Sequence, residues 1–152
     1  MFEWVIENKL ARWHRPGYSS REVSQDEVDK WIERVKSEGI KSIICLLHEE
    51  QLDYYNTLPN GLIDYYQQQG FHVEHIPAPD YQNPPLTDEH LQKVWKAYQK
   101  LPKPVLIHCS AGKDRTGAAV EYITNQINEN SNKNINSFIQ SDTTLNERLI
   151  HH

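Results

Sequence analysis

Two stretches of the chain carry apolar residues at helical spacing. The i, i+3, i+4, i+7 pattern is followed by Val28, Trp31, Ile32 and Val35, and also by Leu91, Val94, Trp95 and Tyr98. Ser24 and Glu27 have the spacing of a capping box before the first stripe, and Thr87 can cap the second. Gly39 and Pro102 follow the two stripes, where helices commonly end. The pattern predicts two amphipathic helices.

Other segments have the composition of strands. Ile43–Leu47 and Val105–Ile107 are continuous apolar runs, which are typical of strands buried on both faces. Phe71–Ile76 is expected to be a strand, and Phe2–Trp13 is expected to hold one or two short strands. Between 49 and 69 we expect a tyrosine-bearing helical stretch with a break at Pro59.

The alternation of strands and helices indicates an α/β fold. We expect a single domain over residues 1–152, in which a mostly parallel central sheet is flanked by helices and residues 1–13 supply N-terminal strands. Pro77–Pro85 is too rich in proline for regular structure. Residues 127–152 are rich in asparagine, which predicts a loop followed by a short helix near Leu145–Ile150.

Composition narrows the function classes. The formal net charge is −5 and basic residues form no patch, so a nucleic-acid partner is not expected. Two cysteines cannot form a disulfide framework, which favours a reducing, cytoplasmic location. The N-terminal residues do not have the pattern of a signal peptide, and no window has the ~20 apolar residues of a membrane span.

The most informative stretch is His108–Gly117, which directly follows the apolar run 105–107. A short loop at a helix start aims backbone N–H groups and the positive end of the helix dipole at one point, which favours phosphate. Small residues in the loop, Ser110, Ala111 and Gly112, allow the backbone to approach a ligand, and Arg115 can bind two phosphate oxygens. The same positive field stabilises a thiolate, so Cys109 is expected to be a nucleophile.

The stretch resembles the His-Cys-x-x-Gly-x-x-Arg-[Ser/Thr]-Gly motif of the cysteine-dependent protein tyrosine phosphatase superfamily. The resemblance to its bacterial dual-specificity-like branch extends upstream through Arg15-Pro16-Gly17-Tyr18, the run 39–47 and Ile76-Pro77-Ala78-Pro79-Asp80. It implies a dual-specificity-phosphatase fold and hydrolysis of a phosphomonoester through a phosphocysteine intermediate. It implies no metal or other cofactor.

The resemblance also implies roles for single residues. Asp80 would protonate the leaving group and then activate water, whereas the rival carboxylate, Asp88, is expected to be a helix N-terminal charge. The Thr116 hydroxyl could donate to the cysteine sulfur. His108 is expected to hydrogen-bond nearby backbone and support the loop.

Several alternatives remain open at this stage. Lys113 beside Asp114, on the rim of the phosphate-binding loop, is compatible with a phosphoinositide or inositol phosphate phosphatase as well as with a protein phosphatase. A protein of another class, an inactive phosphate-binding module, is also possible, and so is a reversible disulfide between Cys45 and Cys109, as in some relatives. Sequence predicts a phosphorylated protein or small phosphomonoester as the partner.

Overall fold

The computed structural model describes residues 1–150, with side chains through Ile135, as one α/β domain. Within this range, strands form one sheet in the order β1-β2-β5-β3-β4. The strands are β1 (Glu3–Ile6), β2 (Leu10–Trp13), β3 (Ser42–Cys45), β4 (His72–His75) and β5 (Val105–His108). All neighbours are parallel except β1, which pairs antiparallel with β2. The prediction of a mostly parallel sheet is confirmed.

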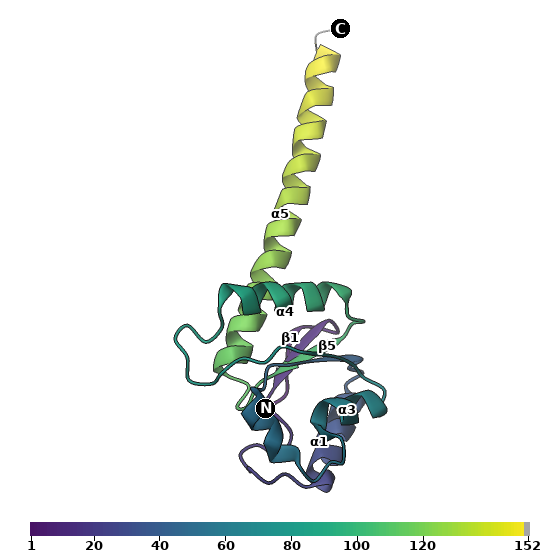
Figure 1. Cartoon of the computed structure of the whole chain (residues 1–152). Helices are drawn as coiled ribbons and strands as arrows, with labels where there is room; N and C mark the ends of the chain where they lie inside the picture. The colour runs from purple at the N-terminus through teal and green to yellow at the C-terminus, as the bar shows by residue number, and fades with distance from the viewer. Residues whose placement is uncertain (151–152) are drawn as a thin grey trace.

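The helices follow in the predicted places, except that α5 is much longer than predicted. They are α1 (Gln25–Ser37), α2 (Glu49–Leu52), the 3-10 helix η1 (Asp53–Tyr55), α3 (Gly61–Gln68), α4 (Asp88–Lys100) and α5 (Asp114–Ile150). Ser24 and Glu27 form the predicted capping box of α1, and Thr87 caps α4. The sheet lies between α4 and α5 on one side and α1 and α3 on the other (Figure 1).

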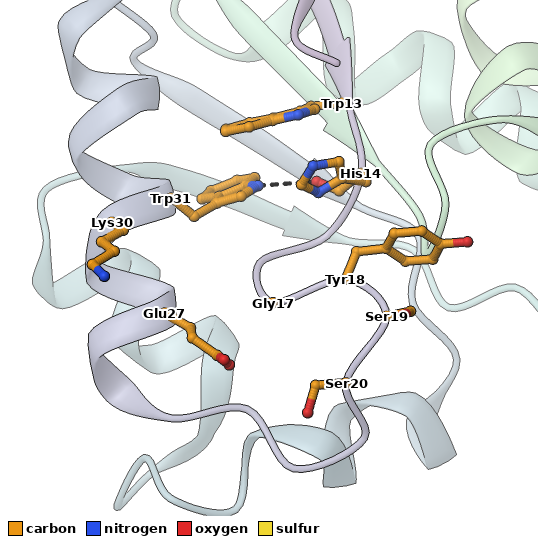
Figure 2. Close-up of a pocket in the computed structure, with 9 residues that line it drawn as sticks. All are labelled: Trp13, His14, Gly17, Tyr18, Ser19, Ser20, Glu27, Lys30 and Trp31. Carbon is orange, nitrogen blue, oxygen red and sulfur yellow. Dashed lines mark hydrogen bonds between the residues drawn. The ribbon is translucent and has the colours of Figure 1, made fainter.

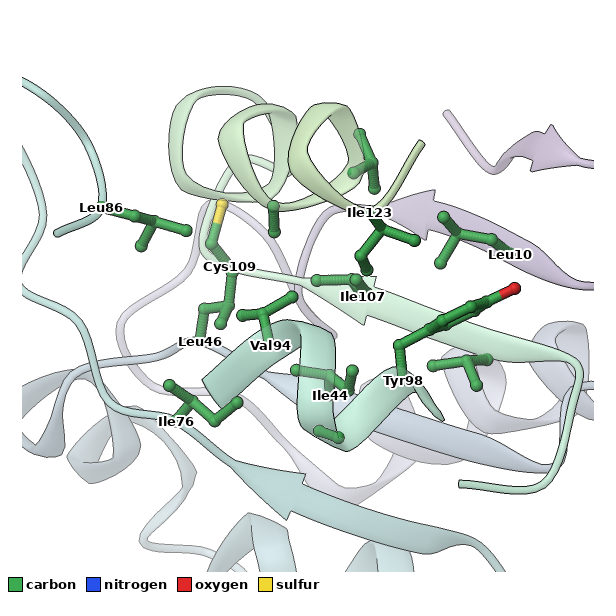
Figure 3. Packing of buried hydrophobic residues seen from close by; sticks show 14 of the residues in the cluster. Leu10, Ile44, Leu46, Ile76, Leu86, Val94, Tyr98, Ile107, Cys109 and Ile123 are labelled. Atoms are coloured by element: carbon green, nitrogen blue, oxygen red, sulfur yellow. The ribbon is translucent and has the colours of Figure 1, made fainter. Parts of the chain in front are cut away.

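Alternate residues of the central strands fill two separate apolar clusters. Ile107 of β5 packs in the cluster beneath α4 and α5, with Cys109 at its edge (Figure 3). Leu106, the residue before it, packs in the cluster beneath α1 and α3. The register aligns Trp13 and Cys45 with His108. The carboxyl ends of β2, β3 and β5 therefore lie side by side, where ligands bind in open parallel sheets.

The prediction of a loop after Gln126 is wrong. α5 continues without a break through the asparagine-rich segment to Ile150, and its second half extends away from the rest of the domain (Figure 1). Asparagine costs at most ~0.7 kcal/mol per residue in a helix, and residues 118–150 contain no glycine or proline. The first turns are anchored by buried Ala119 and Ile123, so the helix propagates without a new nucleation step.

Between residues 1 and 150, no helix has both the length and the apolar character that crossing a bilayer demands.

Candidate active site

Cys109 lies directly after the central strand β5, and α5 begins five positions later at Asp114. The Cys109 residue is 2% exposed. Arg115, in the first turn of α5, is equally buried. The short connection 109–113 thus joins a buried thiol to a helix N-terminus and a buried guanidinium, as the motif predicts.

Two arginines, one in β2 and one just after it, donate hydrogen bonds to the outer side of this loop. Arg12 donates from Nη2 to the carbonyl oxygens of Gly112, at 2.8 Å, and Lys113, at 3.2 Å. The backbone N–H of Arg15 donates to the Ser110 carbonyl at 2.9 Å, and its Nε donates to the Ser110 hydroxyl at 3.1 Å. Because these hydrogen bonds engage the loop carbonyl groups from the outer side, the loop N–H groups stay available to an anion on the inner side.

Arg15 also adds charge to the site. It is 2% exposed. Its guanidinium donates to the Ser20 carbonyl and the Tyr55 hydroxyl and lies 4.8 Å from the centre of the Tyr54 ring. Among the described residues no carboxylate pairs with it. An unpaired buried cation behind the loop favours a bound anion.

Gly112 is required by the packing of the loop against β2. Its φ is +76°, and a Cβ there would lie 2.4 Å from the Trp13 carbonyl oxygen. Gly39, after α1, has a similar φ of +83° but open space around it.

We expect Gly112→Ala to destabilise the domain far more than Gly39→Ala. Both variants incur the cost of a left-handed alanine, about 1 kcal/mol. Only the first also forces the β2 backbone to move, which should raise the loss to about 3 kcal/mol. Urea unfolding of the two variants and the wild type measures the difference; equal losses would contradict this account of the loop.

The two ends of the Arg115 guanidinium have different surroundings. Nη1 donates to Gln51 Oε1 and to the Ala78 carbonyl, both at 2.8 Å, and to the Leu46 carbonyl at 3.3 Å. Nε and Nη2 are buried and have no hydrogen-bond partner among the described residues. One end is therefore anchored, while the Nε–Nη2 edge can bind two oxygens of one phosphate.

Asp80 reaches this arginine from the irregular segment between β4 and α4. Its Oδ2 lies 2.9 Å from Arg115 Nη2 as an ion pair, without hydrogen-bond alignment. Gln51 Nε2 donates to the same Oδ2 at 3.2 Å. The structure thus brings the expected acid to the expected phosphate ligand. Asp88 instead lies in the first turn of α4, away from this network.

His108 is completely buried beneath the loop. Burial is the main cause that lowers the pKa of His108 to about 4, so the ring is neutral near pH 7. Its Nδ1 lies 2.9 Å from the Cys109 carbonyl oxygen and its Nε2 lies 2.9 Å from the Tyr66 hydroxyl. The carbonyl can only accept, so Nδ1 carries the proton and Tyr66 donates to Nε2. The ring therefore supports the loop backbone.

The remaining predicted site residues lie on or beside the loop. Thr116 is fully buried, and its hydroxyl has no hydrogen-bond partner among the described residues. Lys113 and Asp114 are exposed, whereas Ser110 and Ala111 are partly buried.

The structure does not support the disulfide hypothesis. Cys45 packs in the cluster beneath α1 and α3, whereas Cys109 packs in the cluster on the opposite face. Burial raises the pKa of the Cys45 thiol to about 12. Cys45 is a core residue of β3.

No group of three or more metal-ligating side chains gathers among the residues described. A cavity of about 450 Å³ lies beside the β2–α1 connection (Figure 2) and is lined by Trp13, His14, Gly17, Tyr18, Ser19, Ser20, Glu27, Lys30 and Trp31. It includes neither Cys109 nor Arg115.

Residues that contact the predicted site without having been predicted to do so include Arg12, Gln51 and Tyr66. In the sequence, Arg12 is one of the charged residues in a segment expected to hold short strands, which is only a weak indication of a contact with the site. Gln51 stands in a charged segment after β3 and carried no signal of its own.

The site combines a cysteine after the central strand, a loop with glycine, a buried arginine at a helix start and an aspartate paired with that arginine. This arrangement resembles the site of cysteine-dependent phosphatases. Family comparison agrees, because the model described as "Tc-R-P: Polymorphic toxin system, DSP-PTPase phosphatase" matches residues 18–126. The chain belongs to this family. The matched range contains every predicted site residue.

Solved structures similar to this chain include two phosphatases. One is a mutant form of Tk-PTP, with 22% identity and a TM-score of 0.55, covering 78% of this chain and 66% of that one. Another is the core catalytic domain of the PP-IP phosphatase SIW14 from S. cerevisiae in complex with citrate, with 22% identity and a TM-score of 0.53, covering 78% and 61%. At this identity the likeness establishes the fold. This chain spans slightly less than two thirds of each. A comparison with curated proteins found no match.

Proposed function

We propose that this phosphatase hydrolyses phosphomonoesters through a phosphocysteine intermediate on Cys109. The observation that carries the proposal is the Nε–Nη2 edge of Arg115, which is buried and has no hydrogen-bond partner among the described residues, while Asp80 lies beside it as an ion pair. A planar pair of N–H donors in a site shielded from water can bind two oxygens of a phosphoryl group during its transfer.

The first step forms a bond between the Cys109 sulfur and phosphorus. The bond from phosphorus to the ester oxygen breaks, and Asp80 transfers its proton to that oxygen. Arg115 and the loop amides bind the phosphoryl oxygens throughout.

The second step releases inorganic phosphate. A water oxygen attacks phosphorus, Asp80 accepts the water proton, and the electron pair of the sulfur–phosphorus bond returns to Cys109. The Thr116 hydroxyl, which has no other partner among the described residues, can donate to the departing thiolate. No metal or organic cofactor takes part in either step.

We propose phosphotyrosine in proteins as the preferred substrate class, with phosphoserine or phosphothreonine second. The buried position of Cys109, 2% exposed, supports a substrate whose phosphate extends on a long side chain. Asp114 beside Lys113 reduces the positive charge at the rim, which disfavours a highly phosphorylated inositol. The free thiols of both cysteines support the cytoplasm as the proposed location.

We expect Asp80→Ala to lower kcat for a phosphotyrosine peptide by about 10²–10³-fold, within the range of a lost general acid. KM should change little, because Arg115 still binds the phosphate. Steady-state rates on phosphotyrosine peptide, phosphoserine peptide and inositol hexakisphosphate, each at several concentrations, measure the effect and rank the substrates.

The matched control is Asp88→Ala, which removes the rival carboxylate at the start of α4. It should retain the wild-type rate. An unchanged rate for Asp80→Ala would remove Asp80 from the mechanism, and a higher kcat/KM on the inositol phosphate would replace the proposed substrate class.

A further inference from the structure

Gln51 is the residue that joins the two proposed catalytic groups. It lies in the short helix α2, which follows strand β3, and is nearly buried at 9% exposure. Its side chain contacts Arg115, in the first turn of α5, and Asp80, in the segment between β4 and α4. Three separate segments therefore meet at one amide.

The surroundings determine the orientation of this amide. Oε1 accepts from Arg115 Nη1 at 2.8 Å and from the His48 backbone N–H at 3.1 Å. Both partners can only donate, so the oxygen must face them. The nitrogen then faces Asp80 Oδ2, which lies 3.2 Å away.

The Oδ1 atom of Asp80 accepts from the backbone N–H of Tyr81 at 3.0 Å. The Oδ2 atom has two further partners, and they respond differently to substrate. Its ion pair uses Arg115 Nη2, which belongs to the edge that the phosphate would occupy. The bond from Gln51 uses neither Nε nor Nη2. When phosphate engages Arg115, the ion pair competes with it, whereas the Gln51 bond can persist.

Glutamine also suits this position better than the amino acids of most similar size and shape. A glutamate could still accept from Arg115, but it would place a second negative oxygen against Asp80. A methionine would fill similar volume without either polar contact. Only an amide offers an acceptor on one side and a donor on the other.

We propose that Gln51 is a positioning residue, which holds the general acid Asp80 in place relative to the phosphate-binding Arg115 during proton transfer. This inference rests on the proposed function. Gln51 touches neither substrate nor sulfur in this account and acts through Asp80.

The test compares Gln51→Met and Gln51→Glu with the wild type on phenyl phosphate and p-nitrophenyl phosphate. Phenolate is the poorer leaving group and depends more on the proton donor. We expect Gln51→Met to lower kcat on phenyl phosphate about 10- to 30-fold and on p-nitrophenyl phosphate less than about 3-fold, with KM nearly unchanged. Gln51→Glu, which keeps the acceptor for Arg115, should lose at least as much on phenyl phosphate.

A double variant separates positioning from a general structural effect. In an Asp80→Ala background, Gln51→Met should cause no further loss of kcat, because the group it positions is gone and Arg115 Nη1 still donates to the Leu46 and Ala78 carbonyls. The exposed Gln92→Glu on α4 is the matched surface control. Thermal unfolding checks that each variant folds, and Gln51→Glu, nearly identical in shape, carries the test if Gln51→Met does not.

Two outcomes would overturn the inference. One is an equal loss on both esters, and the other is a further loss in the Asp80→Ala background. Either result, obtained with an active wild type, leaves the phosphatase mechanism intact. Absence of turnover by the wild type on every ester would instead reject the proposed function and the inference with it.

Discussion

Cys109→Ser is expected to lower turnover of p-nitrophenyl phosphate by at least about 10⁴-fold, to the rate of hydrolysis in buffer without protein. Serine retains the shape of the side chain, but its hydroxyl is far less acidic than a thiol and has no base beside it. His108 cannot serve as that base, because its Nε2 accepts from Tyr66 and its Nδ1 donates to the Cys109 carbonyl. The phosphocysteine then cannot form.

Cys45→Ala is the control for this experiment. Cys45 is the second thiol and lies in the cluster on the other face of the sheet, so its removal should leave kcat within about 3-fold of the wild type and cost some stability. Rapid-quench mass spectrometry should find a phosphorylated protein in the wild type and in Cys45→Ala but not in Cys109→Ser. Wild-type activity in Cys109→Ser would end the proposed mechanism.

The loop after β5 was predictable because its residues are close together in the chain. The apolar strand, the thiol, the glycine and the arginine follow one another within residues 105–115, so their spacing alone places them at one strand end. Asp80 was predictable for a different reason. Its proline-rich segment follows a strand parallel to β5, and the ends of parallel strands meet at one edge of the sheet.

The contacts of Gln51 and Arg12 could not be predicted in the same way. Gln51 lies 64 positions from Arg115 and 29 from Asp80 along the chain. Its role depends on where a single turn of helix directs one side chain. Arg12 reaches the loop across 100 positions or more. Hydrophobic patterns fix strands and helices, but they do not fix which long polar side chains meet beyond the strand ends.

The error in the C-terminal segment had another physical origin. Asparagine favours turns because its side chain competes for backbone hydrogen bonds, and its repetition after Gln126 suggested a loop. Each such residue has only a small cost inside a helix that is already nucleated by packing at Ala119 and Ile123. Composition was a weaker guide here than the absence of glycine and proline.

Arg115→Lys is expected to lower kcat/KM by about 10²–10³-fold, although the positive charge is kept. A lysine cannot donate to the acceptors on the Nη1 side, Ala78 and Gln51, while also offering two donors to phosphate. The exposed Arg34→Lys on α1 provides a matched control and should have the wild-type rate. Thermal unfolding of both variants checks that they fold, and inhibition by inorganic vanadate measures how well each binds a phosphate-like anion.

The vanadate result decides what Arg115 contributes. If the guanidinium acts as the bidentate ligand of the phosphoryl oxygens, weaker vanadate inhibition must accompany the lower kcat/KM in Arg115→Lys. Unchanged inhibition with a lower kcat would mean that Arg115 matters mainly through Asp80, its ion-pair partner at 2.9 Å. A full rate with full inhibition would show that charge alone is sufficient. The Nε–Nη2 edge is buried and makes no hydrogen bond within the described residues, and its one contact is the ion pair with Asp80; this argues for the first result, because a point charge would not need those two donors aligned.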